Sequence, residues 1–547
     1  MSASSKKKLR NAEVAEKMTE RQMAEKKEAK KLKIYTVVFC VVMAAMLIFT
    51  IAFTGYNAVT NSGMMERKTI AATVNGHDIT TAELNYYYID YINNFCSNYS
   101  SYLAYIMDTT APLDQQQYSE TQTWADYFLS EAVLSAASNY TLADAAKAAG
   151  HTLTAEEETS IESSLQTATF YAIYSYGFSD LTSYLKGMYG NGASEESYRE
   201  YLTMSALASS YYNAKYNSLT YTDDQIRAAD AEDPLAYNSY NYNYYYIPVS
   251  DYLTGGTTAE DGTVTYSDAE NEAARAAAEE AAASLTAETI LDVEAFDAAI
   301  DVIAAGDTSY SCNNYMYSSL LSAAQEWISD ASRVEGDKNY FAYTTHTHAD
   351  GSTHAEEEDS AAYDQIKGYY VVFFKNATDN TMNLVNVRHV LITEGGTYNS
   401  NTGVYDYTDD MAAAQAKAES LLADWEAGKA SSETFAELAK ANSTDGNAST
   451  GGLYEDIYPG QMTTAFNDWC FDASRQAGDY GIVKTEYGVH IMYFEGYSDI
   501  TYRDFMITND LTDGDITTWY AELTADMTTE LKNTKFVKTD LVLSSAN

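Results

Sequence analysis

Two histidines, His389 and His490, stand at opposite ends of one stretch of the chain, within the segments 387–392 and 487–491. Each segment is a short apolar run with the pattern of a strand. If the two strands pair in one sheet, the imidazoles can meet across it and exchange a hydrogen bond, provided that their tautomers are compatible. A polar loop between them carries a carboxylate, Asp445.

An apolar pocket is expected beside this group. Met462 and Phe466 are four residues apart, which predicts that a thioether and an aromatic ring share one helix face. Two imidazoles, a carboxylate and an apolar pocket could in principle support hydrolysis. However, no Ser, Cys or Lys stands in a recognisable nucleophile setting, and no oxyanion-hole motif is present.

The segments that position these residues follow a fixed order. A strand at 387–392 precedes a helical segment at 412–422, a second helical segment at 435–440, the loop with Asp445, and the closing strand. This order resembles a parvulin-type (PpiC-like) peptidyl-prolyl cis–trans isomerase domain. The matching residues are Arg388-His389-Val-Leu-Ile, Phe435-Ala-Glu-Leu-Ala, Asn442-Ser443-x-Asp445, Gly451-Gly452, Gly460-Gln461-Met462 with Phe466, and Tyr487-Gly488-x-His490-Ile491.

The resemblance implies a four-stranded antiparallel sheet wrapped by helices, with no cofactor. It also implies catalytic roles for His389, Asp445 and His490, and substrate contacts from Met462, Phe466, Tyr487 and Tyr454. For His389, a purely structural role in holding the sheet and the Asp445 loop stays open.

The sequence departs from the family pattern in two places. Tyr454 and Glu455 replace a leucine and a glycine of the family, which alters the pocket rim and puts catalytic efficiency in doubt. The insertion at 393–410 contains no basic residue, which argues against recognition of phosphorylated substrates.

Residues 236–378 repeat the same order of segments, which predicts a second, degenerate parvulin-like domain. Tyr246 and Tyr370 are expected where the second copy has His389 and His490. A polar insertion in this copy carries three histidines, His346, His348 and His354. No helix fixes their geometry, so we expect no metal site there.

The N-terminus predicts a membrane anchor. Residues 1–33 contain 11 lysines and arginines against five glutamates, and an uncharged run of 20 residues follows from Ile34 to Phe53. As a helix, this run would span roughly 30 Å, the thickness of a hydrocarbon core. We therefore expect a single-pass protein of the cell membrane with a cytoplasmic N-terminus and an extracytoplasmic body. A cleaved signal peptide is the less favoured alternative.

Residues 66–235 predict a mostly helical region, whose start at 72–80 resembles the chaperone region of SurA-like and PrsA-like foldases. We expect 515–547 to complete it. Tyr86, Tyr87, Tyr88 and Tyr91 could form a sticky surface for unfolded chains, but we favour packing of most of them in a helical core. The net charge of -46 argues against nucleic acid, and four scattered cysteines form neither a disulfide framework nor a zinc site.

The predicted fold class is α+β with one N-terminal transmembrane helix. The expected parts are a tail at 1–33, an anchor at 34–54, a helical chaperone region at 66–235, and parvulin-like domains at 236–380 and 381–500. The expected function is that of a membrane-anchored PrsA-, PpiD- or SurA-like foldase, which isomerises prolyl bonds in unfolded or newly secreted polypeptides. The alternative is a non-catalytic holdase whose parvulin-like domains only bind clients. A homodimer stays open, and no adhesin-type repeats are present.

Overall fold

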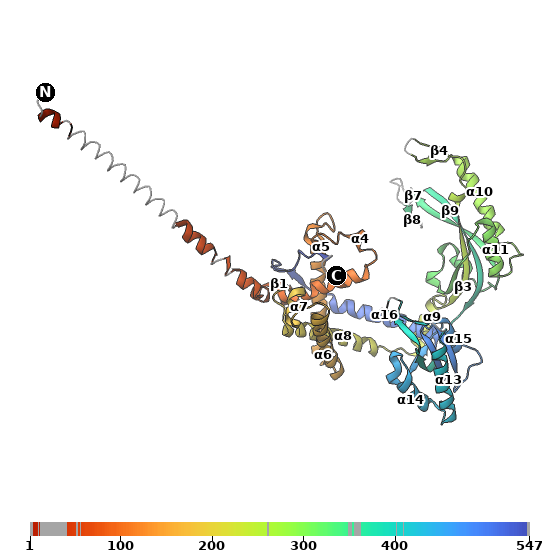
Figure 1. Cartoon of the computed structure of the whole chain (residues 1–547). Helices are drawn as coiled ribbons and strands as arrows, with labels where there is room; N and C mark the ends of the chain where they lie inside the picture. The colour runs from red at the N-terminus through yellow and green to blue at the C-terminus, as the bar shows by residue number, and fades with distance from the viewer. Residues whose placement is uncertain are drawn as a thin grey trace. The chain divides into compact units, whose positions relative to one another are not determined.

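The computed structural model describes residues 4–8, 10, 41–50, 53–54, 56–259, 262–347, 353–354, 363–400, 402–407 and 410–543 (Figure 1). The chain divides into two compact units. The first comprises residues 1–219 with 515–547, and the second comprises residues 220–514.

The prediction of a membrane anchor at 34–54 is corrected by the structure. Among the described residues, no helix is both long and apolar enough to cross a membrane. Residues 34–40, 51 and 52 of the apolar run lie outside the described part, and so do residues 11–33 of the basic tail. On the finding for the described part of the chain, the predicted transmembrane helix, and the single-pass membrane location inferred from it, were wrong.

The first unit is mainly helical. Its elements are α2 (Met64–Lys68), β1 (Ile70–Val74), β2 (His77–Thr80), α3 (Thr81–Asn98), α4 (Leu103–Ile106), η1 (Leu113–Gln115), α5 (Trp124–Ala148), α6 (Ala155–Tyr174), α7 (Leu181–Tyr189), α8 (Glu195–Ser218) and β16 (Thr529–Leu531). Helices α5, α6 and α8 each begin with a capping box, in which the N-cap and N3 residues satisfy each other's backbone donors. The N-cap residues are Thr123, Thr154 and Ser194.

The C-terminal end of the chain contributes to the same unit. Strand β16 pairs antiparallel with β1 and completes a three-stranded sheet in the order β16-β1-β2. The core lies between this sheet and the helices, and Tyr86, Tyr87 and Tyr88 of α3 are buried in it. The expected core packing is confirmed for these three tyrosines, and Tyr91 packs against the same core but is only half-buried.

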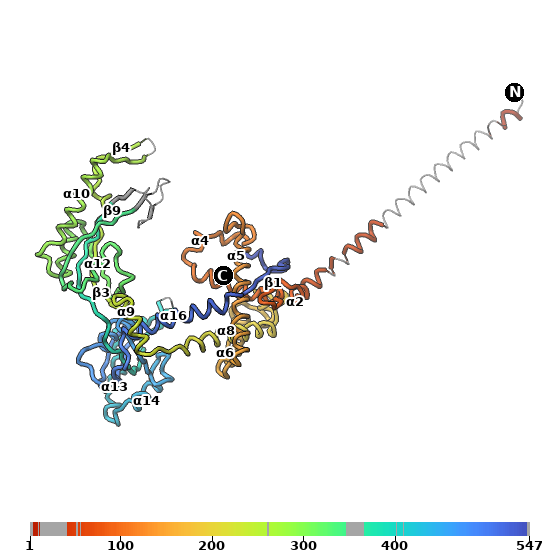
Figure 2. Tube along the Cα trace, turned by 180° about the vertical axis from the view of Figure 1, so that it is seen from behind, coloured from red at the N-terminus to blue at the C-terminus, as the bar shows by residue number. Residues whose placement is uncertain are grey.

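The second unit contains two antiparallel sheets. The elements of the first are α9 (Asp223–Glu232), β3 (Ser239–Pro248), η2 (Val249–Tyr252), β4 (Thr257–Thr258), β5 (Val264–Thr265), α10 (Asp268–Ser284), α11 (Val293–Ile303), β6 (Tyr310–Met316), η3 (Tyr317–Ser319), η4 (Ser322–Ala324), α12 (Gln325–Ile328), β7 (Lys338–Thr347), β8 (Thr353–His354) and β9 (Tyr363–Thr378). The sheet order is β6-β3-β9-β7-β8. Helices α10 and α11 cover one face, and α10 runs beside β9 in both ribbon views (Figures 1 and 2).

The second sheet follows directly along the chain. Its elements are β10 (Asn383–Ile392), β11 (Gly396–Asn399), β12 (Val404–Tyr407), α13 (Ala412–Ala427), α14 (Ser432–Asn442), η5 (Gly446–Thr450), β13 (Leu453–Ile457), α15 (Thr464–Cys470), β14 (Tyr480–Thr485) and β15 (Gly488–Thr501). The sheet order is β13-β10-β15-β14, with all neighbours antiparallel. Strand β10 is an inner strand with buried residues on both faces, which suits its apolar residues, six of the ten.

The two sheets share one topology. Elements β3, α10, α11, β6, α12, β7 and β9 follow the same order as β10, α13, α14, β13, α15, β14 and β15. The four corresponding strands also have the same order in space, β6-β3-β9-β7 against β13-β10-β15-β14.

A shared irregularity corrects one predicted equivalence. The register of β3 with β9 shifts at Tyr242, opposite Phe374, and that of β10 with β15 shifts at Val387, opposite Phe494. Counted from this point, Tyr244 takes the position of His389, so the prediction of Tyr246 was two residues too far along the strand. Positions 244 and 246 lie on the same face of the sheet. Both are tyrosines, so the sequence alone does not show which of them corresponds to His389.

The same count supports the other predicted equivalence. Tyr370 lies four residues before Phe374, as His490 lies four before Phe494.

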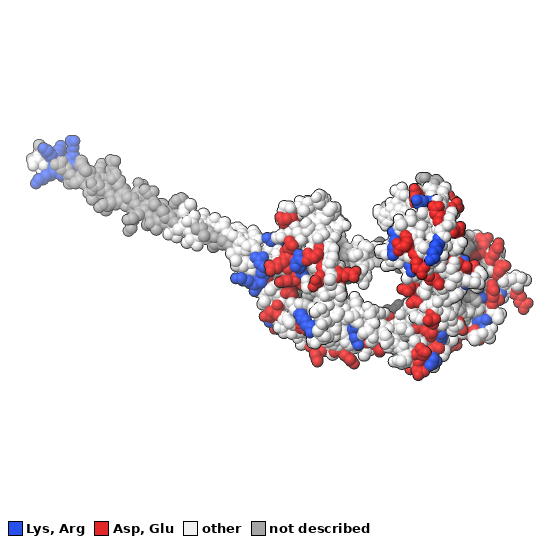
Figure 3. Space-filling model, turned by 90° about the horizontal axis from the view of Figure 1, so that it is seen from below, with Lys and Arg blue, Asp and Glu red and all other residues white. Residues whose placement is uncertain are grey.

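Acidic side chains are scattered over the face of both units that Figure 3 shows.

The end of the second sheet is tied to the start of the first by one arginine. Arg503, the second residue of α16 (Tyr502–Thr524), is only 9% exposed. Its Nε donates to the Asp230 carboxylate at 2.7 Å, and Nη1 donates to Asn238 Oδ1 at 2.8 Å. Nη1 and Nη2 also donate to the carbonyls of Asp379 and Pro234, at 3.0 and 2.7 Å. A nearly buried guanidinium is thus satisfied by four residues, three in the stretch 230–238 and one at 379.

We predict that Arg503→Met lowers the free energy of unfolding of the second unit by roughly 2–3 kcal/mol, because the partner carboxylate and carbonyls lose a charged donor. Urea denaturation of the full chain measures the change. The control is Arg227→Met, whose exposed pair with Asp224 on α9 should contribute less than about 0.5 kcal/mol. Equal effects from the two substitutions would contradict this role.

Candidate active site

The pairing of β10 with β15 brings the two histidines together. In this register Leu391 lies opposite His490 and Met492 lies opposite His389, so the imidazoles are diagonal neighbours on one face. Their Nδ1 atoms are 3.0 Å apart, and the rings stack with centroids 5.2 Å apart. His389 is 1% exposed and His490 is 5% exposed, so the contact is shielded from water.

A chain of hydrogen bonds extends from this contact in both directions. On one side, Thr485 Oγ1 lies 2.8 Å from His490 Nε2 and accepts the Tyr487 backbone N–H at 3.2 Å. On the other, His389 Nε2 faces Asp445 Oδ1 at 3.6 Å. If both imidazoles are neutral, one set of proton positions matches the Asp445 carboxylate, which can only accept, at the end of the chain of hydrogen bonds. Thr485 donates to His490, His490 donates to His389, and the Nε2–H of His389 points to Asp445.

Asp445 is held as an anion by its surroundings. The His389 imidazole is the main influence that lowers the pKa of Asp445 to about 2, assisted by the Asn447 N–H and the Tyr454 hydroxyl. These two groups donate to Oδ1 at 3.0 and 3.2 Å. Burial raises the pKa of Tyr454 to about 12, with a further contribution from the Asp445 charge, so the phenol stays a donor.

His490 is held as a neutral base. Burial, and then the proximity of His389, lower its pKa to about 3. The pair at the centre of the site therefore presents an uncharged, buried His490 beside a His389 whose other nitrogen faces a carboxylate.

The Asp445 loop is bound to β10 at several points. The Leu391 N–H donates to Ser443 Oγ at 3.0 Å, and the Leu391 carbonyl accepts the Thr444 N–H, also at 3.0 Å. Further along, Gly452 approaches so closely that a Cβ there would lie 2.1 Å from the His389 carbonyl oxygen. Its φ of 67° also favours glycine.

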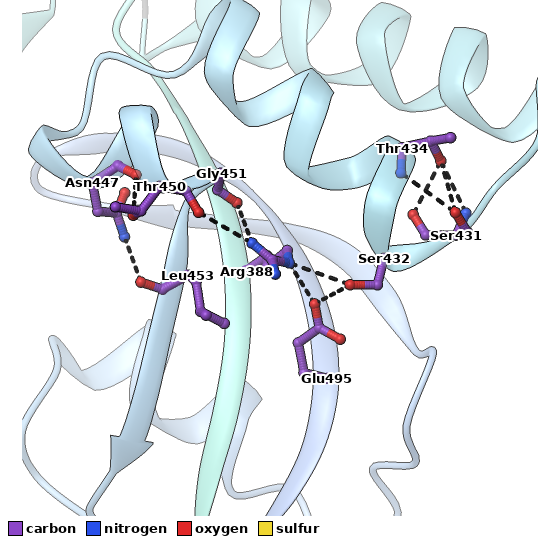
Figure 4. Close-up of polar contacts among 9 residues, drawn as sticks. All are labelled: Arg388, Ser431, Ser432, Thr434, Asn447, Thr450, Gly451, Leu453 and Glu495. Carbon is purple, nitrogen blue, oxygen red and sulfur yellow. Dashed lines mark hydrogen bonds and ion pairs between the residues drawn. The ribbon is translucent and has the colours of Figure 1, made fainter.

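Arg388 fixes the same loop from the opposite face of β10. Figure 4 shows its guanidinium between Glu495 of β15 and the carbonyls of Thr450 and Gly451. Nη1 donates to Gly451 at 3.0 Å, and Ser432 of α14 donates to the same Glu495 carboxylate. Arg388 and Glu495 are 17% and 22% exposed, so this partly buried pair links two strands, a helix and the loop.

The apolar wall of the site is formed by Phe466 of α15. Its ring lies edge-on to both imidazoles, with centroids 5.5 Å from His389 and 5.4 Å from His490. The Tyr454 ring lies 5.1 Å from His389. Met462 packs against the same apolar cluster, but it precedes the helix, which begins at Thr464. The expectation that Met462 and Phe466 share one helix face was therefore wrong.

A groove of about 540 Å³ continues from this wall to the surface. It is lined by Met411, Met462 and Thr485, together with three charged residues, Asp410, Lys484 and Glu486. Tyr487 lies on the adjoining turn and is 42% exposed, and Glu455 points to solvent. Part of the insertion at 393–410 forms the β11–β12 hairpin.

The structure thus brings His389, Asp445, His490, Phe466 and Tyr454 into direct contact, with Met462 close by and Tyr487 at the rim. Sequence reasoning missed Thr485. The sequence feature that could have indicated it is a hydroxyl residue at the end of β14, five residues before His490 on the next strand of the same hairpin.

The histidine insertion of the first sheet remains untested. Residues 348–352 lie outside the described part, and no group of metal-ligating side chains gathers among the residues that are described.

Comparison with known proteins gives one family match. Residues 370–495 match the family model of the PPIC-type PPIase domain. No curated protein matches the chain significantly.

Several solved structures resemble parts of the chain. The peptidylprolyl isomerase PrsA from Bacillus anthracis is 19% identical, with 27% of this chain and 59% of that chain covered and a TM-score of 0.18. PrsA from Bacillus subtilis is 20% identical over 29% of this chain and 55% of that chain, with a TM-score of 0.19. A structure of SurA-like chaperones from Campylobacter jejuni is 21% identical over 26% and 53%, with a TM-score of 0.16.

The chain spans less than two thirds of each of these three relatives, and at such TM-scores the likeness assigns nothing by itself. The family match is the decisive finding, and it confirms the predicted parvulin-type resemblance. The facing histidines of β10 and β15 both fall within its bounds. The chain therefore contains a PPIC-type, that is parvulin-type, peptidyl-prolyl isomerase domain.

Proposed function

We propose that this chain is a protein-folding factor that catalyses cis–trans isomerisation of prolyl bonds in unfolded polypeptides, at the site between β10, β15 and α15. The observation that carries the proposal is the buried His389–His490 contact beside the Phe466 ring, within the domain that matches the isomerase family.

The reaction requires rotation about a bond and no bond cleavage. A prolyl amide isomerises slowly because the twisted state loses amide resonance, at a barrier of about 18–20 kcal/mol. A site accelerates this step only by binding the twisted amide more tightly than the planar one. The planar amide is the more polar of the two, so an apolar and water-free surface favours the twisted form.

The residues of the site suit this task. Phe466, with Met462, offers an apolar seat for the proline ring, and the neutral His490 avoids a buried charge beneath the amide. His389 Nε2 is buried and makes no hydrogen bond to any described residue. We assign to His389 a positioning role: its Nε2–H points to Asp445, and its Nδ1 accepts from His490 and so orients that ring toward the amide.

We also propose that the helical unit binds unfolded clients. Four aromatic side chains at the end of α6 and in the turn after it are at least half exposed, namely Phe170, Tyr171, Tyr174 and Tyr176. Exposed apolar clusters of this kind support transient contacts with unfolded chains. A holdase without catalysis would use this surface alone.

We predict that His490→Ala and Met462→Ala each lower kcat/KM toward a short proline peptide at least about tenfold in the full chain, because each loses a part of the surface that favours the twisted amide. A protease-coupled isomerisation assay measures it. His77→Gln, a histidine of the first unit, is the control and should keep wild-type activity.

A wild-type rate no faster than that of His490→Ala and Met462→Ala would sink the catalytic claim. If the same proteins still suppressed client aggregation, the holdase alternative would stand.

We predict that Thr485→Val, which removes the hydroxyl from His490 Nε2 but keeps the shape, lowers kcat/KM about tenfold, the worth of one buried hydrogen bond. Thr485→Ser should restore most of the activity. Nitrogen NMR shifts of the His490 ring should change in the valine variant and return in the serine variant. Unchanged ring shifts in the valine variant would show that Thr485 does not set the tautomer.

We predict that acid lowers the free energy of unfolding of the wild-type domain, because the buried His490 resists protonation in the folded state. Its folded pKa of about 3 lies below the unfolded value of 6.5, so between these values the unfolded chain binds a proton that the folded chain rejects. Stability is therefore lost as pH falls from 6.5. Asp445, with a folded pKa of about 2, contributes its own loss only below pH 3.8.

Between pH 7.5 and pH 5, the free energy of unfolding of the wild type should fall by roughly 2 kcal/mol more than that of His490→Gln. Urea unfolding at the two pH values measures this. Parallel losses in the two proteins would contradict a buried neutral His490.

A further inference from the structure

The first sheet carries a cluster of five tyrosines where the second carries its histidines. Tyr244 and Tyr246 of β3, Tyr310 of β6, Tyr343 of β7 and Tyr370 of β9 lie on one face, and we call this group the tyrosine face. By register, Tyr244 and Tyr370 take the places of His389 and His490. The opposite face packs under α10 and α11 as an apolar core.

The rings of the tyrosine face form one continuous aromatic surface. Tyr370 lies at its centre, with centroids 4.8 Å from Tyr246 and 5.7 Å from both Tyr244 and Tyr343. Tyr310 lies 5.3 Å from Tyr244 and is 56% exposed. The other four rings are half-buried, so the surface is open to a partner.

The sequence makes room for this surface. A Cβ at Gly368 would fall 2.5 Å from the Cζ and hydroxyl atoms of Tyr246. Any side chain at that position would displace the ring from the sheet. The absence of a side chain at Gly368 therefore leaves the space that the Tyr246 ring occupies beside β9.

In both sheets, apolar side chains cover the part of this face next to the shared register shift. In the first sheet, Leu320, Ala324 and Ile328 belong to the cluster around Tyr242 and Phe374, and Tyr244 at the start of the tyrosine face packs against it. In the second sheet, α15 covers Val387 and Phe494, and its Phe466 ring also lies against His389 and His490. The tyrosine face thus occupies the position of the substrate surface in the isomerase domain.

The chemistry of the tyrosine face suits an extended, proline-containing chain. Proline-rich segments adopt an open helix whose backbone carbonyls have no internal partner, and aromatic-lined surfaces bind such segments through the pyrrolidine rings. No hydrogen bond joins the hydroxyls of Tyr244, Tyr246 and Tyr370 to other described residues, so these phenols remain available as donors. Burial raises the pKa of Tyr246 to about 12, so its donor is present at neutral pH.

We propose that the tyrosine face is a second, non-catalytic binding site for proline-containing extended segments of client polypeptides. Without the histidine pair and its carboxylate, it holds such a segment but does not turn over the prolyl bond. The inference rests on the proposed function for the identity of the client as an unfolded polypeptide, and it adds a binding site that this function does not require.

The test is calorimetric titration of the full chain with an acetylated decapeptide of five Ala-Pro repeats. A matched peptide of five Ala-Ser repeats is the control and should bind neither site. Tyr246→Ala/Tyr370→Ala should lose one equivalent of binding, or weaken it at least about tenfold, since two stacked rings are removed. Tyr246→Phe/Tyr370→Phe should keep that equivalent with a weaker affinity, because the rings remain but two hydroxyl donors are lost.

Two further measurements separate this site from the catalytic one. Isomerase activity toward a short peptide should be unchanged in Tyr246→Ala/Tyr370→Ala. A decapeptide with a benzophenone end group should cross-link to residues 240–248 or 366–374 in wild type. If activity fails in wild type while these cross-links persist, the proposed catalysis is lost and the tyrosine face stands.

Unchanged stoichiometry in the alanine variant, or no cross-link to either strand, would overturn the proposal. If the double alanine variant does not fold, Tyr343→Ala and Tyr310→Ser replace it, because both side chains lie at the edge of the cluster. Retained binding in both of these variants would overturn the proposal equally.

Discussion

The antiparallel pairing of β10 with β15 is the constraint on which the site depends. His389 and His490 are separated by 101 residues of chain, yet their Nδ1 atoms meet at 3.0 Å because this pairing places them diagonally on one face. A slip of one residue would turn one ring to the opposite face. A slip of two would keep the face but separate the rings. The irregularity at Val387 and the clamp between Arg388 and Glu495 hold the register in place.

The same fold serves two different surfaces in this chain. Both sheets share element order and strand order, but one carries imidazoles beside a carboxylate and the other carries phenols. Chemistry therefore belongs to the side chains placed on the sheet and not to the sheet itself. Catalysis is assigned to the histidines of β10 and β15. The proposed binding of clients to the tyrosine face would give one molecule a second site for the same polypeptide.

Sequence reasoning found the domain because motif spacing reflects the order of strands and helices, and the histidine pair because strand pairing brings the two ends of the stretch together. It missed Thr485, since a hydroxyl at a strand end is common and its partner depends on the turn. It misplaced Tyr246 because tyrosines alternate on β3, and it misjudged Met462 because the helix start at Thr464 is set by local backbone geometry. The anchor at 34–54 was inferred from an apolar run and its basic flank, and no described helix supports it.

The most direct test of the account exchanges the two surfaces. Exchange NMR spectroscopy of a short proline peptide detects cis–trans interconversion while the peptide is in contact with the full chain. Wild type should give exchange cross-peaks between the cis and trans signals. In His389→Tyr/His490→Tyr, which gives the second sheet the residues of the first, these cross-peaks should vanish while the protein stays folded. Cross-peaks of equal strength in the variant would contradict the assignment of catalysis to the histidine pair.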